Sequence, residues 1–230
     1  KEIINQVVEA YSADDYSFIT KPPGNSKWSN QLGDAMVKFG SQVLGDIQKA
    51  TVLEIGAGSD YVASNLSSIK DISNYTIVDP AIDSEAKKQS STNLISGYFG
   101  ECDLGRKTFD VVFSFNCLEH VPEPIKFLWN VRNLMRDDKA RLGFMFPNIE
   151  RQIIVGDFNG IVHEHMNYFT PSTARRAFEL CGFSILSSWS TGDSFYVIAK
   201  PENQIFRDYE DIAAAPDEIL DQSALKIETS

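Results

Sequence analysis

The chain alternates between short continuous runs of apolar residues and longer segments in which apolar residues recur every three or four positions. Continuous short runs are typical of strands that are buried on both faces of a parallel sheet, and the longer segments are typical of helices that bury one face. We therefore predict an α/β domain with helices on both faces of a mostly parallel sheet. The predicted strands are 51–55, 75–78, 94–99, 109–115, 141–146, 183–189 and 195–199, and the predicted helices are 1–18, 29–44, 61–69, 124–134, 173–180 and 206–225.

The last two predicted strands, 183–189 and 195–199, are separated only by a short turn that contains Thr191-Gly-Asp193. Strands joined this closely must pair antiparallel, because a parallel pair needs a long crossover connection. The predicted sheet thus contains five parallel strands followed by an antiparallel closing pair.

The pattern divides the chain into three parts. We expect an N-terminal helical cap or lid over 1–48, an α/β domain over 49–200 and an acidic helix or tail over 201–230. The first part includes a loop with Lys21 and Trp28, and Trp28 is expected either to stack on a substrate or to anchor the loop.

Composition narrows the function classes. The net charge of −11 argues against the concentrated basic surface that a nucleic-acid-binding protein needs. No apolar run is long enough to span a bilayer and no signal peptide is recognisable, so we predict a cytoplasmic protein.

The three cysteines form no C-x-x-C pair and are expected to be reduced core thiols. Because the chain begins with Lys1, we expect either a trimmed chain or part of a larger polypeptide. A homodimer is the other assembly that we consider.

A glycine-rich turn follows the first predicted strand, where Gly56 and Gly58 come after Glu54. Glycines at the carboxyl end of a strand let the backbone turn sharply and approach a ligand closely. The second strand ends at Asp79, whose carboxylate can accept hydrogen bonds from both hydroxyls of a ribose. These features fit either a dinucleotide or S-adenosylmethionine. Asp60 favours the second, because an acid at the start of the next helix suits a helix cap but repels a pyrophosphate.

Three segments resemble the motif series of class I S-adenosylmethionine-dependent methyltransferases, over about residues 50–200. They are VLEIGAG at 52–58, IVDP at 77–80 and FDVVFSFNCLEHV at 109–121. The resemblance implies a Rossmann-like seven-stranded sheet in the order 3-2-1-4-5-7-6, with the last strand antiparallel, and S-adenosylmethionine as the cofactor. Many members of that family have a third alternate glycine where this chain has Asp60. The cofactor-binding residues implied are Glu54, Gly56, Ala57 and Gly58 at the methionine portion, Asp79 followed by Pro80 at the ribose, Glu101 and Cys102 at the adenine, and Asn116 and Leu118 on the closing loop.

Candidate catalytic residues lie on the loops after the fourth and fifth predicted strands. After the fourth strand, Glu119-His120 is expected to support packing near the cofactor. After the fifth, GIVHEHMNYFTP at 160–171 is similar to the corresponding stretch of sugar methyltransferases, in which a Tyr/His/Glu group supports deprotonation of the sugar. On that resemblance the predicted catalytic residues are His165, His163, Glu164 and Tyr168.

Two other interpretations of the histidines remain open. In one, His165 caps the following helix and packs under Tyr168. In the other, His163 and His165 share one side of an extended loop as metal ligands, with Glu164 on the other side. Because no further ligand is spaced to complete a coordination shell, we predict no metal.

The predicted function is methyl transfer from S-adenosylmethionine to a small polar acceptor, a sugar or sugar nucleotide of a surface polysaccharide or natural-product pathway. One alternative is an NAD-dependent Rossmann oxidoreductase. Another is a non-catalytic methyltransferase-like module that binds a partner through its acidic tail. The choice among O-, N- and C-methylation stays open, because the same scaffold serves all three and function must be argued from the site.

Overall fold

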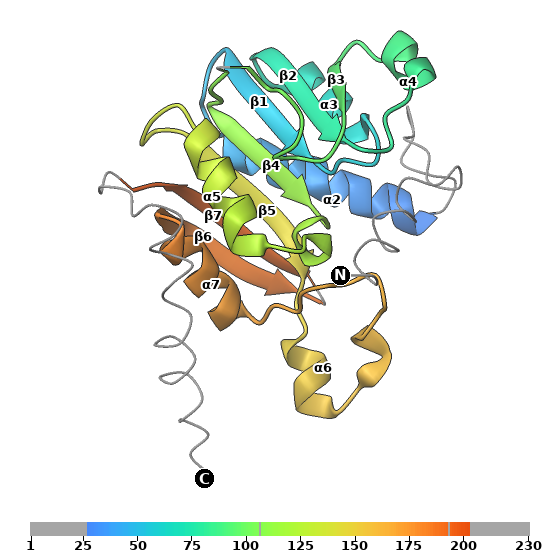
Figure 1. Ribbon diagram of the computed structural model, residues 1–230, viewed down its shortest axis with the longest axis vertical. Coiled ribbons are helices and arrows are strands. Elements are labelled where there is room, and N and C mark those ends of the chain that lie inside the picture. The colour runs from blue at the N-terminus through green and yellow to red at the C-terminus, as the bar shows by residue number, and fades with distance from the viewer. Residues whose placement is uncertain (1–26, 106, 193, 203–230) are drawn as a thin grey trace.

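The computed structural model of the protein describes residues 27–105, 107–192 and 194–202. Its seven strands form one sheet in the order β3-β2-β1-β4-β5-β7-β6, as Figure 1 shows. Neighbouring strands pair parallel from β3 to β5, and β7 pairs antiparallel with both β5 and β6. The predicted fold class and strand order are therefore confirmed. The strands are β1 (Ala50–Ile55), β2 (Ile72–Asp79), β3 (Asn93–Ser96), β4 (Val111–Phe115), β5 (Arg141–Pro147), β6 (Phe183–Thr191) and β7 (Ser194–Pro201).

Helices cover both faces of the sheet and each face has its own hydrophobic core. On one face, α2 and α3 bury Phe39, Val43 and Leu66 against strand residues such as Phe113. On the other face, α5 and α7 pack around a cluster of rings that includes Phe178. The helices are α2 (Lys27–Leu44), α3 (Tyr61–Ile69), α4 (Ser84–Gln89), α5 (Pro124–Leu134), α6 (Glu150–Val155) and α7 (Pro171–Leu180), with short 3-10 helices at η1 (Leu118–His120) and η2 (Phe158–Gly160).

Helix α2 belongs to the predicted N-terminal cap, yet its described part packs directly on the sheet. Phe39, Val43 and Leu44 are almost fully buried, so this helix is part of the domain core. The predicted helix over 1–18 and the loop around Lys21 lie outside the described residues, as does the acidic helix predicted over 206–225.

Several predicted strand bounds needed correction. β2 begins at Ile72 rather than at residue 75, and β6 and β7 extend to Thr191 and Pro201 rather than to residues 189 and 199. β3 ends at Ser96 rather than at residue 99, because Gly97 takes a φ of +145° that breaks the extended backbone. β4 starts at Val111 rather than at residue 109, and Phe109 instead makes an isolated bridge with Met135. The short helices α4, α6, η1 and η2 were not predicted, because segments of three to six residues are too short to show a helical period.

Candidate cofactor and acceptor site

The glycine turn after β1 lies at the carboxyl ends of the parallel strands. Gly56 and Gly58 have φ values of +69° and +63°, in the left-handed region that favours glycine. A Cβ placed on Gly56 would lie only 2.5 Å from the Cys117 Sγ, whereas one placed on Gly58 would meet nothing within 4 Å. Gly56 therefore lets the loop after β4 pack against the turn, and Gly58 leaves open space above it.

Asp79, at the end of β2, faces this turn. Its Oδ2 accepts a hydrogen bond from the Gly58 N–H at 2.9 Å, and its Oδ1 accepts one from the Ala81 N–H at 2.8 Å. Burial raises the pKa of the Asp79 carboxyl, although these two hydrogen bonds act in the opposite direction. Each oxygen keeps a second lone pair, so the carboxylate can still accept hydrogen bonds from ribose hydroxyls.

Glu54, on β1, is fully buried beside Asp79. The Tyr75 hydroxyl donates a hydrogen bond of 2.7 Å to the Glu54 Oε2. Burial raises the pKa of Glu54 to about 8, and the charges of Asp79 and Asp60 add to the rise, while the bond from Tyr75 lowers it. A cation bound near this carboxyl would be favoured, because it would offset the cost of holding the charge out of water.

Asp60 precedes α3 and is also buried, but its carboxylate does not cap the helix as predicted. Its Oδ2 instead accepts a hydrogen bond from the Ser90 hydroxyl at 2.8 Å, and its Oδ1 has no hydrogen-bond partner. The φ of Asp60 is −93°, so no glycine is required at this position. This explains why the turn keeps its shape without the third alternate glycine.

The other predicted cofactor residues differ in their position relative to this turn and in their burial. Cys102 packs near Gly97, whose N–H donates to the Asp79 carbonyl, so the predicted adenine stretch lies beside Asp79. Asn116 adopts a left-handed φ of +49° directly after β4. The Leu118 side chain is buried in the core, so only its backbone can face a ligand. Ala57 and Pro80 are half-buried in the two turns and Glu101 is exposed.

The loops after β4 and β5 meet near the same edge of the sheet. The N–H groups of Met166 and Asn167 both donate to the backbone carbonyl of Glu119, at 2.8 and 3.0 Å. The rings of His120 and His165 lie edge to face with their centroids 4.9 Å apart. The structure thus brings together the two candidate groups that the sequence placed on separate loops, which spacing along the chain could not show.

The four predicted catalytic residues have different surroundings. The His163 side chain is 90% exposed and Glu164 is about half exposed. The Tyr168 hydroxyl accepts from the Val162 N–H and donates to the Val162 carbonyl, which closes the loop on itself. His165 is partly buried beside His120 and Tyr168.

In one alternative, His165 caps the following helix and packs under Tyr168. The structure contradicts the first half of this alternative and confirms the second. The N-cap of α7 is Thr170, whose hydroxyl accepts from the Thr173 N–H, so His165 does not cap that helix. The predicted packing against Tyr168 is confirmed, with ring centroids 5.9 Å apart.

Burial shifts the pKa values of Glu119, His120 and His165, which lie where the two loops meet. It raises the pKa of Glu119 to about 7, and the Glu119 Oε2 has no hydrogen-bond partner. Burial lowers the pKa of both His120 and His165, and the neighbouring His120 lowers that of His165 further. The two imidazoles are therefore favoured as neutral rings with a lone pair available on one nitrogen.

A cavity of about 170 Å³ opens beside His165, between the end of β5 and the loop after it. Its lining includes Asn148, Gln152 and Asn167, together with His165 and Tyr168. The Gln152 Oε1 is buried without a hydrogen-bond partner, so it can accept one from a bound hydroxyl. Asn148 and Gln152 are not among the site residues predicted from the sequence. Their one signal was a position directly after the fifth strand, where open sheets place their ligands.

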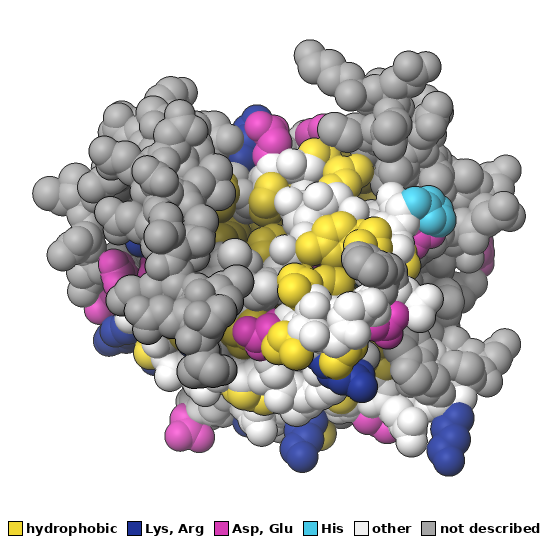
Figure 2. Space-filling view, turned by 90° about the horizontal axis from the view of Figure 1, so that it is seen from below, with side chains coloured by type: hydrophobic (Ala, Val, Ile, Leu, Met, Phe, Trp, Pro, Cys, Tyr) yellow, Lys and Arg dark blue, Asp and Glu magenta, His cyan; other side chains and the backbone are white. Residues whose placement is uncertain are grey.

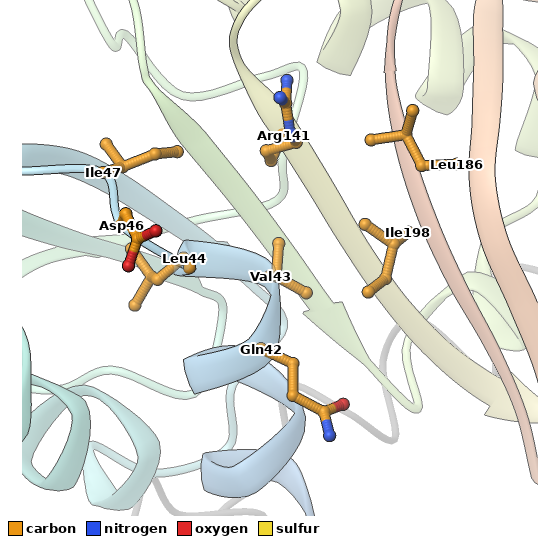
Figure 3. Close-up of a pocket in the computed structure, with 9 residues that line it drawn as sticks. Gln42, Val43, Leu44, Asp46, Ile47, Arg141, Leu186 and Ile198 are labelled. Carbon is orange, nitrogen blue, oxygen red and sulfur yellow. The ribbon is translucent and has the colours of Figure 1, made fainter.

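A larger cavity of about 430 Å³ lies elsewhere, between the end of α2 and strands β5, β6 and β7. Figure 3 shows Val43, Ile198 and Leu186 around it, with Arg141 at the start of β5. Because Arg141 begins its strand, this cavity lies at the edge opposite to the glycine turn. Figure 2 shows the molecule from below the view of Figure 1, where hydrophobic and uncharged side chains fill the centre and charged side chains of both signs lie around them.

Comparisons with solved structures identify the fold. A chain in the complex of the Haloferax volcanii Trm112 methyltransferase activator with a methyltransferase has a TM-score of 0.65 at 14% identity, covering 89% of this chain and 100% of its own. The Burkholderia thailandensis 1,6-didemethyltoxoflavin-N1-methyltransferase, solved with S-adenosylhomocysteine, has a TM-score of 0.64 at 16% identity, covering 88% of both chains. The Bradyrhizobium japonicum N-methyltransferase NodS, also solved with S-adenosylhomocysteine, has a TM-score of 0.60 at 11% identity and covers 87% of this chain and 99% of its own.

Sequence comparison adds the family. A search of curated protein sequences found no significant match. Among the described residues, no helix is both long and apolar enough to cross a bilayer. The family model described as a methyltransferase domain matches residues 29–188, which span the glycine turn, Asp79 and the two histidine loops. The chain therefore belongs to the methyltransferase domain family.

Proposed function

We propose that the protein transfers a methyl group from S-adenosylmethionine to a small polar acceptor, a sugar or sugar nucleotide of a surface polysaccharide or natural-product pathway. The observation that carries this proposal is the pairing of two sites at one edge of the sheet. Buried acids surround the glycine turn, and a small polar cavity opens beside His165. A sulfonium and an ammonium suit the first site, and hydroxyl groups suit the second.

The residues at the turn fit the cofactor. Glu54, Asp60 and Asp79 are buried, and no ion pair within the described part of the chain joins them to Lys or Arg. Gly58 leaves the space above the turn open. When bound there, S-adenosylmethionine supplies an electrophilic methyl group. The chain's own residues hold it, with Asp79 oriented for the ribose and the acidic turn for the cationic end.

The acceptor site fits a compact, hydroxylated ligand. Its volume of about 170 Å³ is below the roughly 300–1,000 Å³ of pockets for drug-sized molecules. Amide side chains from Asn148, Gln152 and Asn167 line it, and such groups recognise hydroxyls by donating and accepting hydrogen bonds. We propose His165 as the residue that contacts the reacting group of the acceptor, with Tyr168 beside it in the lining of the cavity. His163 and Glu164, which the sequence also suggests, do not line the cavity, and no contact with the acceptor is proposed for them.

The NAD-dependent alternative has less support. Asp60 and Glu54 are buried near the start of α3, where a dinucleotide would need to place its pyrophosphate. Calorimetric titration with S-adenosylhomocysteine and with NAD tests the choice. Binding of the first alone is expected, and binding of NAD alone would overturn the proposal.

Replacing Asp79 by asparagine is expected to weaken S-adenosylhomocysteine binding by about 10- to 100-fold, because hydrogen bonds to a charged group contribute roughly 1.5–3 kcal/mol. Calorimetry measures the change. The matched control is Asp83→Asn, because Asp83 is an exposed acid that caps α4 and asparagine caps equally well. Equal affinities for the two variants would remove Asp79 from the cofactor site.

Replacing His165 by asparagine is expected to lower turnover at least about 100-fold while leaving S-adenosylhomocysteine affinity unchanged, because contact with the reacting group affects transfer and not cofactor binding. Turnover is measured by mass spectrometry on a panel of nucleotide-activated sugars. His163→Asn is the control on the same loop, since that side chain is 90% exposed. Unchanged turnover in the His165 variant would show that the acceptor reacts elsewhere.

A further inference from the structure

Three potential metal ligands converge where the loops after β4 and β5 meet. One carboxylate oxygen of Glu119 and one imidazole nitrogen each from His120 and His165 all lie within 4.8 Å of one another. Hydrogen bonds from Met166 and Asn167 to the Glu119 carbonyl fasten the two loops together beside this cluster. The three ligands are therefore held on a braced framework rather than on free surface side chains.

His120 is oriented as metal-binding histidines usually are. Its Nδ1 lies 2.9 Å from the backbone carbonyl of Glu164, and a carbonyl can only accept, so Nδ1 carries the proton. The lone pair is then on Nε2, which lies 3.7 Å from the Glu119 Oε1. A histidine whose other nitrogen donates to a carbonyl is the common arrangement around a metal, because it fixes both tautomer and ring orientation.

Glu119 provides an independent indication of a bound cation. Its side chain is only 2% exposed, and its Oε2 has no hydrogen-bond partner. Within the described ranges, no ion pair joins it to Lys or Arg. A carboxylate buried in this way is costly unless a charge compensates it, and a metal ion would do so.

We propose that Glu119, His120 and His165 bind one divalent transition-metal ion of the zinc class, which leaves coordination positions open for an oxygen of the acceptor. Two histidines and one carboxylate form a ligand set that zinc enzymes use when a position must stay open, and related ions accept it too. Ligands around a tetrahedral zinc ion lie about 3.4 Å apart for bonds of about 2.1 Å. Because the three ligand atoms lie within 4.8 Å of one another, their separations would need to close by up to about 1.4 Å on binding.

The position of the cluster gives the ion a role in the proposed function, on which this inference rests. His165 lines the acceptor cavity. Glu119 lies two residues after Cys117, which packs against Gly56 of the cofactor turn. An ion at the cluster would thus lie between the two sites and polarise a hydroxyl of the acceptor as a Lewis acid. His165 would then act as a ligand.

The test titrates the chelator-treated protein with Zn²⁺ by calorimetry and with Co²⁺ by visible absorption. We expect one equivalent of each metal to bind, and Co²⁺ to give the absorption bands of a low-symmetry site. Glu119→Gln and His165→Gln should each weaken Zn²⁺ binding by more than 100-fold, since losing a second-shell partner alone costs about 10- to 100-fold. His163→Gln, which alters an exposed histidine of the same loop, should bind Zn²⁺ as the wild type does.

A second measurement separates failure of this inference from failure of the proposed function. S-adenosylhomocysteine binding is measured on the same samples, which also shows whether each variant is folded. Cofactor binding by the wild type without stoichiometric Zn²⁺ or Co²⁺ binding would overturn the metal site and leave the methyltransferase proposal intact. Metal binding that is equally weakened in the His163 variant would also overturn it. Loss of cofactor binding in the wild type would overturn the proposed function, whatever the metal result.

Discussion

Replacing Gly56 by alanine is expected to lower the free energy of unfolding by about 3 kcal/mol and to abolish measurable S-adenosylhomocysteine binding. Two costs add together. A left-handed backbone conformation costs a residue with a Cβ about 1–2 kcal/mol. The new Cβ would also lie 2.5 Å from the Cys117 Sγ and 2.8 Å from its Cβ, and overpacking costs about 1–3 kcal/mol. Relief of the overlap must move the glycine turn or the loop after β4, and both belong to the proposed cofactor site.

Gly58→Ala is the matched control for this variant. Gly58 has nearly the same positive φ, but an added Cβ meets nothing within 4 Å. Its variant should therefore lose only the backbone contribution, about 1–2 kcal/mol, in urea unfolding. In a double variant, Cys117→Ala should recover part of the loss caused by Gly56→Ala, because it removes the nearer of the two clashing atoms. Equal losses at the two glycines would show that packing against Cys117 is not what requires Gly56.

The sequence predicted the sheet and the glycine turn after β1 well because both depend on local signals. Runs of buried strand residues fix the parallel strands, and the short turn around Gly192 forces the antiparallel pair. Glu54, Gly56 and Asp79 follow their strands directly, so the carboxyl edge of the sheet gathers them without any knowledge of loop conformation. The errors at β3 and β4 arose at strand ends, where a left-handed glycine or an isolated bridge outweighs residue preference.

The histidine cluster could not be predicted in the same way. His120 and His165 meet because the backbone of Glu119 accepts hydrogen bonds from a loop more than forty residues away. Spacing along the chain therefore suggested His163 as the companion of His165, although His163 is exposed in the structure. The structure adds a second acid beside His165, Glu119, which comes from the loop after β4. Contacts of this kind depend on how two loops dock, which no short sequence pattern encodes.

The second large expected effect is that Glu54→Gln stabilises the cofactor-free protein increasingly as the pH rises from 5 to 8. The pKa of Glu54 is raised from 4.5 to about 8 in the folded protein. Between these values the folded state keeps a proton that the unfolded state has lost, so stability falls as the pH rises. Glutamine does not titrate, yet its carbonyl can still accept the Tyr75 hydroxyl. The difference in free energy of unfolding between the wild type and the variant should grow by on the order of 3 kcal/mol from pH 5 to pH 8.

Urea unfolding of both proteins at pH 5 and pH 8 measures this difference, and the other buried acids cancel because both proteins contain them. The same carboxyl links stability to cofactor binding. If the cationic end of S-adenosylmethionine lies near Glu54, binding at neutral pH should release the proton of Glu54. The binding heat of the wild type should then vary with the ionisation enthalpy of the buffer, and that of Glu54→Gln should vary less. A stability difference that stays constant from pH 5 to 8 would mean that Glu54 is already ionised in the folded protein, and that the turn attracts the cation with a charge already in place.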